Sequence, residues 1–300
     1  MAVDRAVPVD LAARADGSEM PAVERPEFLP DPDLEGDEME SLQADIAAAA
    51  TFEDDHEFRL GAVDGQVTLA TDDRGVAAEH SDDRGSASGA REDGEPTALS
   101  HSTVVAGVDQ AFLDDGRAVS AVVAMQDGEV IETVTATDTV EIPYVPGLLA
   151  FREGGSIASA LERLSAEPDV LLVDGSGRIH FREAGLATHV GVLFDLPAVG
   201  VAKSLLCGSP VDATDGLVAG ERVAIEADDS VSAPDGETIG YALQTRQFDS
   251  PNRHVNPVYV SPGHRVSAST AAELAFAACE GYKLPEPIRR ADRIAGDYSE

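Results

Sequence analysis

Lysine and cysteine are both scarce in this chain of 300 residues. Cys207 and Cys279 are its only cysteines, too few for a disulfide framework, so we expect a protein of the reducing cytoplasm. No run approaches the roughly 18 consecutive apolar residues of a membrane span, so none is expected. Residues 1–16 carry acids and lack the apolar stretch of a secretory signal, so we expect no signal there.

The shortage of lysine belongs to a larger imbalance of charge. The chain has 56 acidic and 21 basic residues, a formal net charge of −35, and its only lysines are Lys203 and Lys283. A wholly disordered acidic protein is excluded, because 43% of the residues are hydrophobic. Dense carboxylates with few lysines instead indicate a folded protein that stays hydrated and soluble in concentrated salt.

A charge of this size would normally argue against a nucleic-acid partner, because phosphates are bound by basic surfaces. In concentrated salt this objection loses force. The Debye length is about 3 Å at 1 M salt, so long-range repulsion between the protein and a phosphate backbone is nearly absent. Net charge therefore excludes no class of partner here.

The chain divides into four stretches by composition. Residues 1–36 are rich in proline and acids, and we expect them to be poorly ordered. The apolar pattern over 35–52 predicts a helix, which forms the first folded stretch at 37–55. Residues 56–100 are interpreted as a flexible acidic insertion, since their central part lacks hydrophobic periodicity. The main domain is expected over 101–298.

This main domain begins with strands and then alternates between helices and strands. Three β-branched runs joined by short Asp/Gly connections predict an antiparallel meander. A central parallel strand, with no alternation of polar residues, is predicted later. The sequence therefore predicts a mixed α/β sheet flanked by helices. Strands are expected at 103–112, 118–125, 130–139, 170–174, 198–202, 223–226, 238–245 and 258–260, and helices at 157–164, 186–194, 270–281 and 286–298.

Three acids stand apart from the many that only solvate the surface. Asp109 and Asp174 each end a buried apolar run, where open α/β sheets place their sites, and Glu153 lies near a predicted helix start. Three convergent carboxylates would suit Mg²⁺. Each acid also has a plainer explanation, such as a turn for Asp174 or interaction with the helix dipole for Glu153. Their joint arrangement favours a metal site.

Two other residues follow predicted strands. Lys203 comes directly after the strand at 198–202, in a chain that has lost nearly all its lysines. An ammonium beside a phosphate would explain its retention, whereas a leftover surface lysine is the plainer alternative. His264 follows the SPG segment at 261–263, and taken alone it would more often be a structural histidine.

The segments around these residues together resemble one family, endonuclease V. The resemblance covers about residues 103–295, extends weakly to 37–50, and is most specific in the Pro-Tyr-x-Pro segment with its downstream Phe-Arg-Glu. The matching segments occur in the family's order: VAGVD at 105–109, PYVPGLLAFRE at 143–153, DGSG at 174–177, GVAK at 200–203, SPGH at 261–264 and LPEP at 284–287.

The resemblance implies an RNase H-like fold, in which three antiparallel strands precede alternating helices and parallel strands. It also implies a repair endonuclease that hydrolyses the second phosphodiester bond 3′ to a deoxyinosine and leaves 3′-hydroxyl and 5′-phosphate ends. The implied cofactor is Mg²⁺, with Mn²⁺ as a substitute. The expected partner is DNA containing deoxyinosine, bound by a cytoplasmic monomer.

The family's functional residues fall on particular positions of this chain. The resemblance makes Asp109 and Asp174 metal ligands, with Glu153 contacting the metal through water, and it places Lys203 near the scissile phosphate and His264 in the active site. The predicted strand-separating wedge and the predicted base pocket follow from two further sets: Pro143, Tyr144, Val145 and Pro146 for the wedge, and Gly147, Leu149, Gly175 and Leu186 for the pocket.

Two departures and two alternatives remain open. The family usually has His-Pro after Asp-Gly-x-Gly, whereas this chain has His180-Phe181, so the loop there is expected to differ. The insertion at 60–98 has no counterpart that we can place. The substrate could instead be RNA that contains inosine, because one sequence does not reveal a contact to a 2′-hydroxyl. A lesion-binding protein without activity is the other alternative, and the intact set of acids argues against it.

Overall fold

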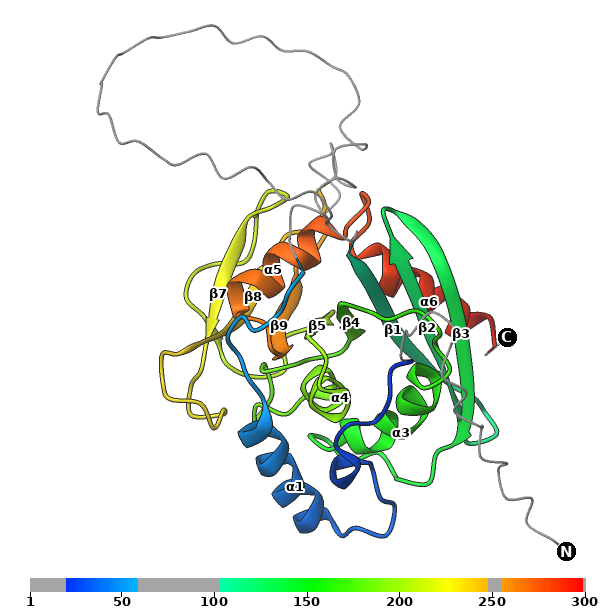
Figure 1. Ribbon diagram of the computed structural model, residues 1–300. Helices are drawn as coiled ribbons and strands as arrows, with labels where there is room; N and C mark the ends of the chain where they lie inside the picture. Colours follow the sequence, from blue (N-terminus) through cyan, green and yellow to red (C-terminus); the bar gives the residue numbers. More distant parts are fainter. Residues whose placement is uncertain (1–19, 59–102, 248–254, 299–300) are drawn as a thin grey trace, which may run out of the picture.

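One mixed β-sheet forms the centre of the molecule and helices cover both of its faces (Figure 1). The computed structural model describes residues 20–58, 103–247 and 255–298. Within these residues nine strands pair in the order β3-β2-β1-β4-β5-β9-β8-β7-β6. No helix in the described part of the chain is long and apolar enough to cross a membrane.

The predicted meander is present at one side of the sheet. It consists of β1 (Val104–Phe112), β2 (Arg117–Gln126) and β3 (Glu129–Thr139), which pair antiparallel. The turn between β2 and β3 is Asp127-Gly128, and both residues have positive φ, as a tight two-residue hairpin requires. The Asp-Gly signal in the sequence therefore placed this turn correctly.

The chain then alternates between helices and parallel strands. Helix α3 (Leu149–Leu161) leads to β4 (Val170–Asp174), which pairs parallel to β1. Helix α4 (Leu186–Phe194) leads to β5 (Ala198–Ala202), which pairs parallel to β4. The carboxyl ends of β1, β4 and β5 therefore meet at one edge of the sheet, the edge where open α/β sheets bind ligands.

Antiparallel strands complete the other side. Strand β9 (Val258–His264) pairs with β5, followed outward by β8 (Thr238–Leu243), β7 (Arg222–Glu226) and the short β6 (Ser209–Pro210). The last two helices are α5 (Ala268–Ala277) and α6 (Glu286–Asp297). The sequence predicted all of these elements except β6, which has only two residues.

Alternation along the strands separates two cores. Side chains at even positions of β1 and odd positions of β4 pack against α3 and α4, as Val108 and Val173 do. The opposite parity, represented by Val105 and Leu172, packs against α5 and Ile288 of α6. Whether a residue of β1 or β4 has an even or an odd number therefore determines which face of the sheet its side chain lies on, and which helices it packs against.

The N-terminal residues differ from expectation. Residues 20–35 pack on the domain through the short 3₁₀ helix η1 (Pro26–Phe28), which lies against α4, and through backbone N–H groups of Glu24 and Arg25 that donate to the Leu193 carbonyl. Phe28 is buried in the core and gives this proline-rich stretch an apolar anchor. The prediction of poor order over 1–36 is therefore wrong for 20–35, and residues 1–19 lie outside the described part.

Helix α1 (Gly36–Ala49) confirms the predicted N-terminal helix, and its start is stabilised by a reciprocal capping box between Glu35 and Glu38. The predicted insertion at 56–100 begins too early, because Phe58 is buried in the core formed with α5. Residues 59–102, which include the central part of the insertion, lie outside the described residues.

Candidate active site

Asp109 and Asp174 lie at the carboxyl ends of two neighbouring parallel strands. Asp109 shares its side of β1 with Val105 and Gly107, and Asp174 shares its side of β4 with Leu172. Both carboxylates therefore face the side that α6 covers. The start of α6 approaches β1 closely at Gly107, where a Cβ atom would lie 2.1 Å from the carbonyl carbon of Pro287.

This close approach brings a third acid to the pair. Carboxylate oxygens of Asp109, Asp174 and Asp292 lie within 4.8 Å of one another. Asp292 is on α6, a helix in which half of the residues are charged, and nothing in its local sequence distinguishes it from a solvated surface acid. These three residues are called the acid cluster below.

Glu153 faces the same region but does not belong to the acid cluster. It lies on α3, which covers the other face of the sheet, and it lines a cavity together with Asp109 and Asp174. The sequence placed Glu153 as the third acid beside these two. The structure adds Asp292 to Asp109 and Asp174, while Glu153 is a half-buried carboxyl that lines the same cavity and lies near enough to Asp174 for their charges to interact.

Burial and mutual repulsion raise the pKa of these carboxyls. Burial, followed by the charge of Asp174, raises the pKa of Asp109 to about 8. The same two causes raise the pKa of Glu153 to about 7. Burial also raises the pKa of Asp174, although a hydrogen bond from Lys203 opposes the shift. The site therefore concentrates more negative charge than its surroundings stabilise.

Lys203 lies directly at the acid cluster. Its Nζ atom is 2.7 Å from Oδ2 of Asp174 and 3.4 Å from Oδ1 of Asp292. Partial burial lowers the pKa of Lys203, but the hydrogen bond to Asp174 and the neighbouring acids outweigh it, so the pKa is raised overall. Lys283, the other lysine, is near enough that the charge of Lys203 adds to burial in lowering its pKa. The two lysines of the chain thus lie near enough for their charges to interact.

The acid cluster has the chemistry of a divalent-metal site. It offers hard carboxylate oxygens, which suit Mg²⁺ or Mn²⁺. The raised pKa values of Asp109 and Asp174 also show an excess of negative charge that a divalent cation would neutralise. The residues present therefore fit a bound metal ion.

A cavity of about 420 Å³ opens beside the acid cluster. Three loops, helix α3 and the start of α4 contribute lining residues, and the ends of β1 and β4 complete the lining. Every residue of the predicted base pocket lines it, together with two wedge residues and three predicted site acids: Gly147, Leu149, Gly175 and Leu186, then Tyr144 and Pro146, then Asp109, Glu153 and Asp174.

Two glycines keep this cavity open. Gly147 has φ +83°, a conformation that other residues rarely adopt, and it turns the chain between the predicted wedge and α3. Gly175 has φ +153°, and a Cβ there would lie 3.2 Å from a side-chain carbon of Leu186. A side chain at either position would strain the backbone, and one at Gly175 would also crowd Leu186.

The predicted wedge residues 143–146 are exposed at the mouth of the cavity, with Tyr144 66% exposed. Such exposure of a tyrosine is notable in a chain with few aromatic residues. The adjacent Ile142 is buried and its carbonyl accepts a hydrogen bond from Arg152 at 2.9 Å, which fixes the base of the segment. An anchored loop with an exposed ring at its tip can enter a partner molecule.

Among the lining residues that sequence reasoning did not assign, three have side chains of particular interest. Leu206 and Phe181 are partly exposed at its rim, and the ring of Phe181 lies 3.5 Å from where a Cβ of Gly147 would be. His180 is buried, and this burial together with the charge of Arg182 lowers its pKa to about 4, so the ring is neutral. The Phe181 that replaces the expected proline thus faces the cavity.

The structure does not bring His264 to the acid cluster. Val260 and Val201 pair at the level of Asp174, whereas His264 pairs with Ala198 at the other end of β5, three residues or about 10 Å further along that strand. The buried ring accepts a hydrogen bond from the backbone N–H of Thr51 and lies 3.0 Å from Oδ1 of Asp195. These contacts join Thr51, two residues after the end of α1, to Asp195 at the end of α4.

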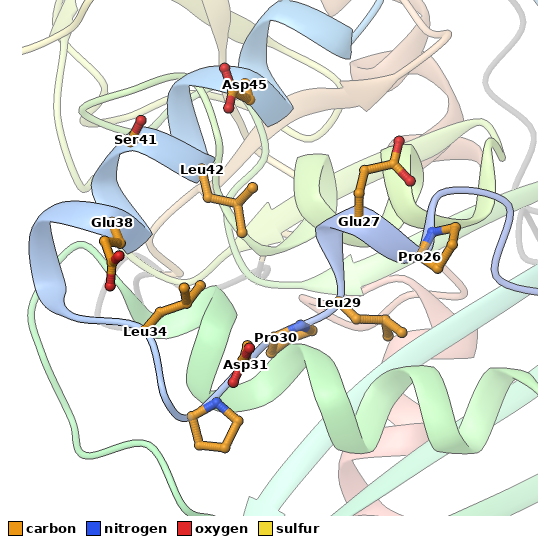
Figure 2. Close-up of a pocket in the computed structure, with 11 residues that line it drawn as sticks. Pro26, Glu27, Leu29, Pro30, Asp31, Leu34, Glu38, Ser41, Leu42 and Asp45 are labelled. Carbon is orange, nitrogen blue, oxygen red and sulfur yellow. The ribbon is translucent and has the colours of Figure 1, made fainter.

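A second hollow of about 600 Å³ lies between the N-terminal segment and α1 (Figure 2). It shares no lining residue with the cavity beside the acid cluster. Its charged groups are all carboxylates, from Glu27, Asp31, Glu38 and Asp45, set around apolar side chains such as Leu34 and Leu42. Because it offers no cation, it would repel a phosphate.

Comparison with known proteins identifies similar chains. The family model described as Endonuclease V matches residues 90–293. The endonuclease V of Haloarcula marismortui is 56% identical over 275 residues, covering 91% of this chain and 96% of that protein. The crystal structure of endonuclease V from Streptomyces avermitilis has a TM-score of 0.66 at 28% identity, covering 90% of this chain and 96% of the other.

A third similar protein was solved with nucleic acid. Ciona intestinalis endonuclease V, in complex with a 24mer DNA containing an inosine followed by a ribo-adenosine, has a TM-score of 0.55 at 28% identity. The match covers 65% of this chain and 85% of the Ciona chain.

Proposed function

The chain belongs to the endonuclease V family, and we propose that it cuts a DNA strand at the second phosphodiester bond 3′ to a deoxyinosine. It is a nuclease with the RNase H-like fold, and it hydrolyses phosphodiester bonds. One observation carries the proposal on the cutting position: a single cavity connects the predicted base pocket, the predicted wedge and the acid cluster.

The cavity suits a purine base that has left the duplex. Enzymes that read a single damaged base extrude it into a pocket, where backbone groups and apolar side chains contact it. Gly147 and Gly175 leave the backbone of the walls accessible, and Leu149 and Leu186 offer apolar surface to the faces of the base. The sugar and the 3′ phosphates would then run toward the acid cluster and Lys203.

Tyr144 is the residue that we propose to fill the gap left by the extruded base, because an aromatic ring with a polar tip can stack on the remaining bases. Tyr144→Ala should lower kcat/KM about tenfold or more on duplex DNA, where strands must be parted at a cost of a few kcal/mol. The loss should be smaller on single strands. Cleavage of matched duplex and single-stranded oligonucleotides measures both, and Tyr144→Phe, which keeps the ring, should remain near the parent. Equal losses on both substrates would exclude the wedge role.

The acid cluster is proposed to hold the metal ion. Asp109, Asp174 and Asp292 would ligate it, and once bound it supplies charge neutralisation at the phosphate and activation of the attacking water. We propose Mg²⁺ as the metal, with Mn²⁺ as a substitute. Glu153 lines the same cavity and would lie near the reacting phosphate, and with a pKa of about 7 it can take up a proton near neutral pH.

The bond changes follow from the proposed products. The oxygen of a water molecule joins phosphorus, and the bond between phosphorus and the 3′ oxygen breaks. The 3′ oxygen leaves as a hydroxyl after taking up a proton, and the phosphate stays on the 5′ end of the downstream fragment. Lys203 is placed to stabilise the negative charge that builds on the phosphate oxygens during this step.

RNA that contains inosine is a second candidate substrate. The specific observation is the ribo-adenosine that follows inosine in the nucleic acid bound by the Ciona protein. Cleavage of matched deoxyinosine DNA and inosine RNA in parallel, at high KCl with Mg²⁺ or Mn²⁺ titrated from zero, tests both the substrate and the metal. The proposal predicts cutting of DNA that begins only when metal is added, and cutting of RNA alone would overturn the choice of DNA.

The proposal extends to the setting of the protein. All carboxylates, the lysine and the walls of the cavity come from one chain, so a monomer supplies a complete site. Both cysteines are free thiols and buried, which suits a reducing cytoplasm. Residues 103–298 with α1 and the 20–35 segment would form the catalytic domain.

A further inference from the structure

A buried glutamine on α1 connects two walls of the cavity. Gln43 has no solvent exposure, yet its side chain is polar. Its Nε2 atom donates a hydrogen bond of 2.8 Å to the carbonyl of Gly147 and lies 3.5 Å from the carbonyl of Ala184. Its Oε1 atom accepts from Arg182 at 3.2 Å. Both polar ends of one amide are therefore used.

The two contacted segments both contribute to the lining of the same cavity. Gly147 lines it directly, and Ala184 immediately precedes Gly185 and Leu186, which line it as well. Gly147 is also contacted by His180, whose ring hydrogen-bonds to its backbone. Nδ1 of His180 accepts from the N–H of Arg182 at 3.3 Å, so His180 connects the same two segments that Gln43 contacts.

Docking of α1 does not by itself require a glutamine. Met39 and Ile46 on the same helix are buried and already attach it to the domain through apolar contacts. A buried amide is costly unless it is hydrogen-bonded, so its presence here indicates that the two carbonyls need a donor. Arg182, which donates to Gln43, also forms an ion pair with Glu40. This ion pair is partly exposed, so losing it should cost much less than losing a hydrogen bond of the buried amide.

We propose that Gln43 is a positioning residue that fixes the width of the base pocket and thereby the preference for deoxyinosine. This inference rests on the proposed function, because it assumes that the cavity receives the base. Hydrogen bonds to a base from backbone groups depend steeply on distance and angle, so walls that are free to shift bind it less tightly. Gln43 touches neither the acid cluster nor the phosphate, so the chemical step should not depend on it.

Two substitutions test the proposal, and they remove different parts of the network. Gln43→Leu removes both polar ends, whereas Gln43→Glu keeps the acceptor for Arg182 and loses the donor to Gly147. The measured quantity is the dissociation constant for a deoxyinosine oligonucleotide and for the same strand with deoxyadenosine, with EDTA in high KCl. The ratio of the two constants gives the preference for the lesion.

Both variants should reduce this preference about tenfold, because the donor to a buried carbonyl is lost. The loss should come from weaker binding of the deoxyinosine strand, with binding of the deoxyadenosine strand unchanged. With Mg²⁺, KM for the deoxyinosine strand should rise while kcat stays within about threefold of the parent. Glu40→Gln is the matched control, since it weakens only the outer ion pair on the same helix, and it should match the parent.

A folded Gln43→Glu or Gln43→Leu protein with the parent's preference would overturn the proposal. If Gln43→Leu does not fold, as circular dichroism would show, Gln43→Glu decides alone because its carboxylate retains Arg182 as a partner. A fall in kcat with unchanged preference would also contradict the inference. A parent protein without preference for deoxyinosine would instead overturn the proposed function, and the two failures are therefore distinguishable.

Discussion

Asp174→Asn is expected to lower the rate of strand cleavage at least about a thousandfold. A bound metal ion supplies several kcal/mol of charge stabilisation to the reacting phosphate, and each 1.36 kcal/mol corresponds to about a factor of ten in rate. Asp174 is one of three acids with oxygens within 4.8 Å of one another, and it is also the partner of Lys203. Single-turnover cleavage at saturating Mg²⁺ measures the loss. A variant that cuts at the normal rate would contradict the assignment of the acid cluster.

The same kind of change at Asp109 should stabilise the protein when no metal is present. Burial and the charge of Asp174 raise the pKa of Asp109 from 3.8 to about 8, so the folded state binds this proton more tightly than the unfolded chain does. The parent therefore loses stability as the pH rises from about 4 to about 8. Asp109→Asn stays neutral and avoids that loss.

We therefore expect Asp109→Asn to melt at the parent's temperature near pH 4 and several degrees above it near pH 8, in EDTA and high KCl. Thermal unfolding followed by circular dichroism provides the measurement. Glu162→Gln, which changes an exposed acid at the end of α3, is a suitable control and should show no pH-dependent gain. A melting temperature for Asp109→Asn that falls below that of the parent across this pH range would show that burial of the ionised Asp109 beside Asp174 does not destabilise the fold.

Lys203→Gln should reduce kcat about a hundredfold or more, the loss typical of removing one group that stabilises developing charge. KM should change much less, because the lysine is proposed to act on the transition state. The half-saturating metal concentration should not rise, since Lys203 is a positive charge 2.7 Å from Asp174 and competes with a cation there. A large fall in kcat without a rise in the half-saturating metal concentration would identify Lys203 as a catalytic residue. A lysine that only positions the acids of the cluster would change the metal requirement as well.

The other lysine provides the matched control. The charge of Lys203 lowers the pKa of Lys283, whereas Asp174 and Asp292 of the acid cluster both form their ion pairs with Lys203. Lys283→Gln should leave kcat within a few-fold of the parent. A loss as large as that for Lys203→Gln would mean that general positive charge, rather than the position of one ammonium group, supports the reaction.

The sequence predicted most elements because local patterns and tertiary packing agree along most of the chain. They disagree at α3, which is predicted only over 157–164 and whose first turns contain Gly154 and Gly155. The structure begins it at Leu149, because Phe151 is buried in the core and Gly154 lets Pro30 approach to 3.2 Å from where a Cβ would be. Packing thus outweighed the low helix propensity of two glycines.

Strand β9 also extends beyond the range that its local sequence predicts. The Ser-Pro-Gly segment at 261–263 resembles a turn, so the strand was predicted to end at 260. In the structure it continues to His264, since Pro262 pairs opposite Val199 beside a register shift and its carbonyl approaches Gly177. Partners distant in the sequence supplied the contacts that local signals oppose.

Some site residues could likewise be predicted from local sequence, whereas others depend on tertiary contacts. Asp109 and Asp174 were predictable because each ends a buried strand, a signal contained in the local sequence. Asp292 was not, because its helix is rich in charges and only the close approach of α6 at Gly107 brings it to the other acids. Gln43 was also not predictable, since nothing in the sequence of an amphipathic helix indicates that a single glutamine is buried.

The central claim is that the cavity beside the acid cluster receives an inosine base and thereby sets which bond is cut. The most direct test is to map the cut on end-labelled DNA strands that carry one deoxyinosine at different positions, with Mg²⁺ and high KCl. The account predicts that the cut moves with the deoxyinosine, always at the second bond on its 3′ side, and leaves 3′-hydroxyl and 5′-phosphate ends. Cuts that stay at fixed positions, or that occur equally in a strand with deoxyadenosine in place of deoxyinosine, would contradict it.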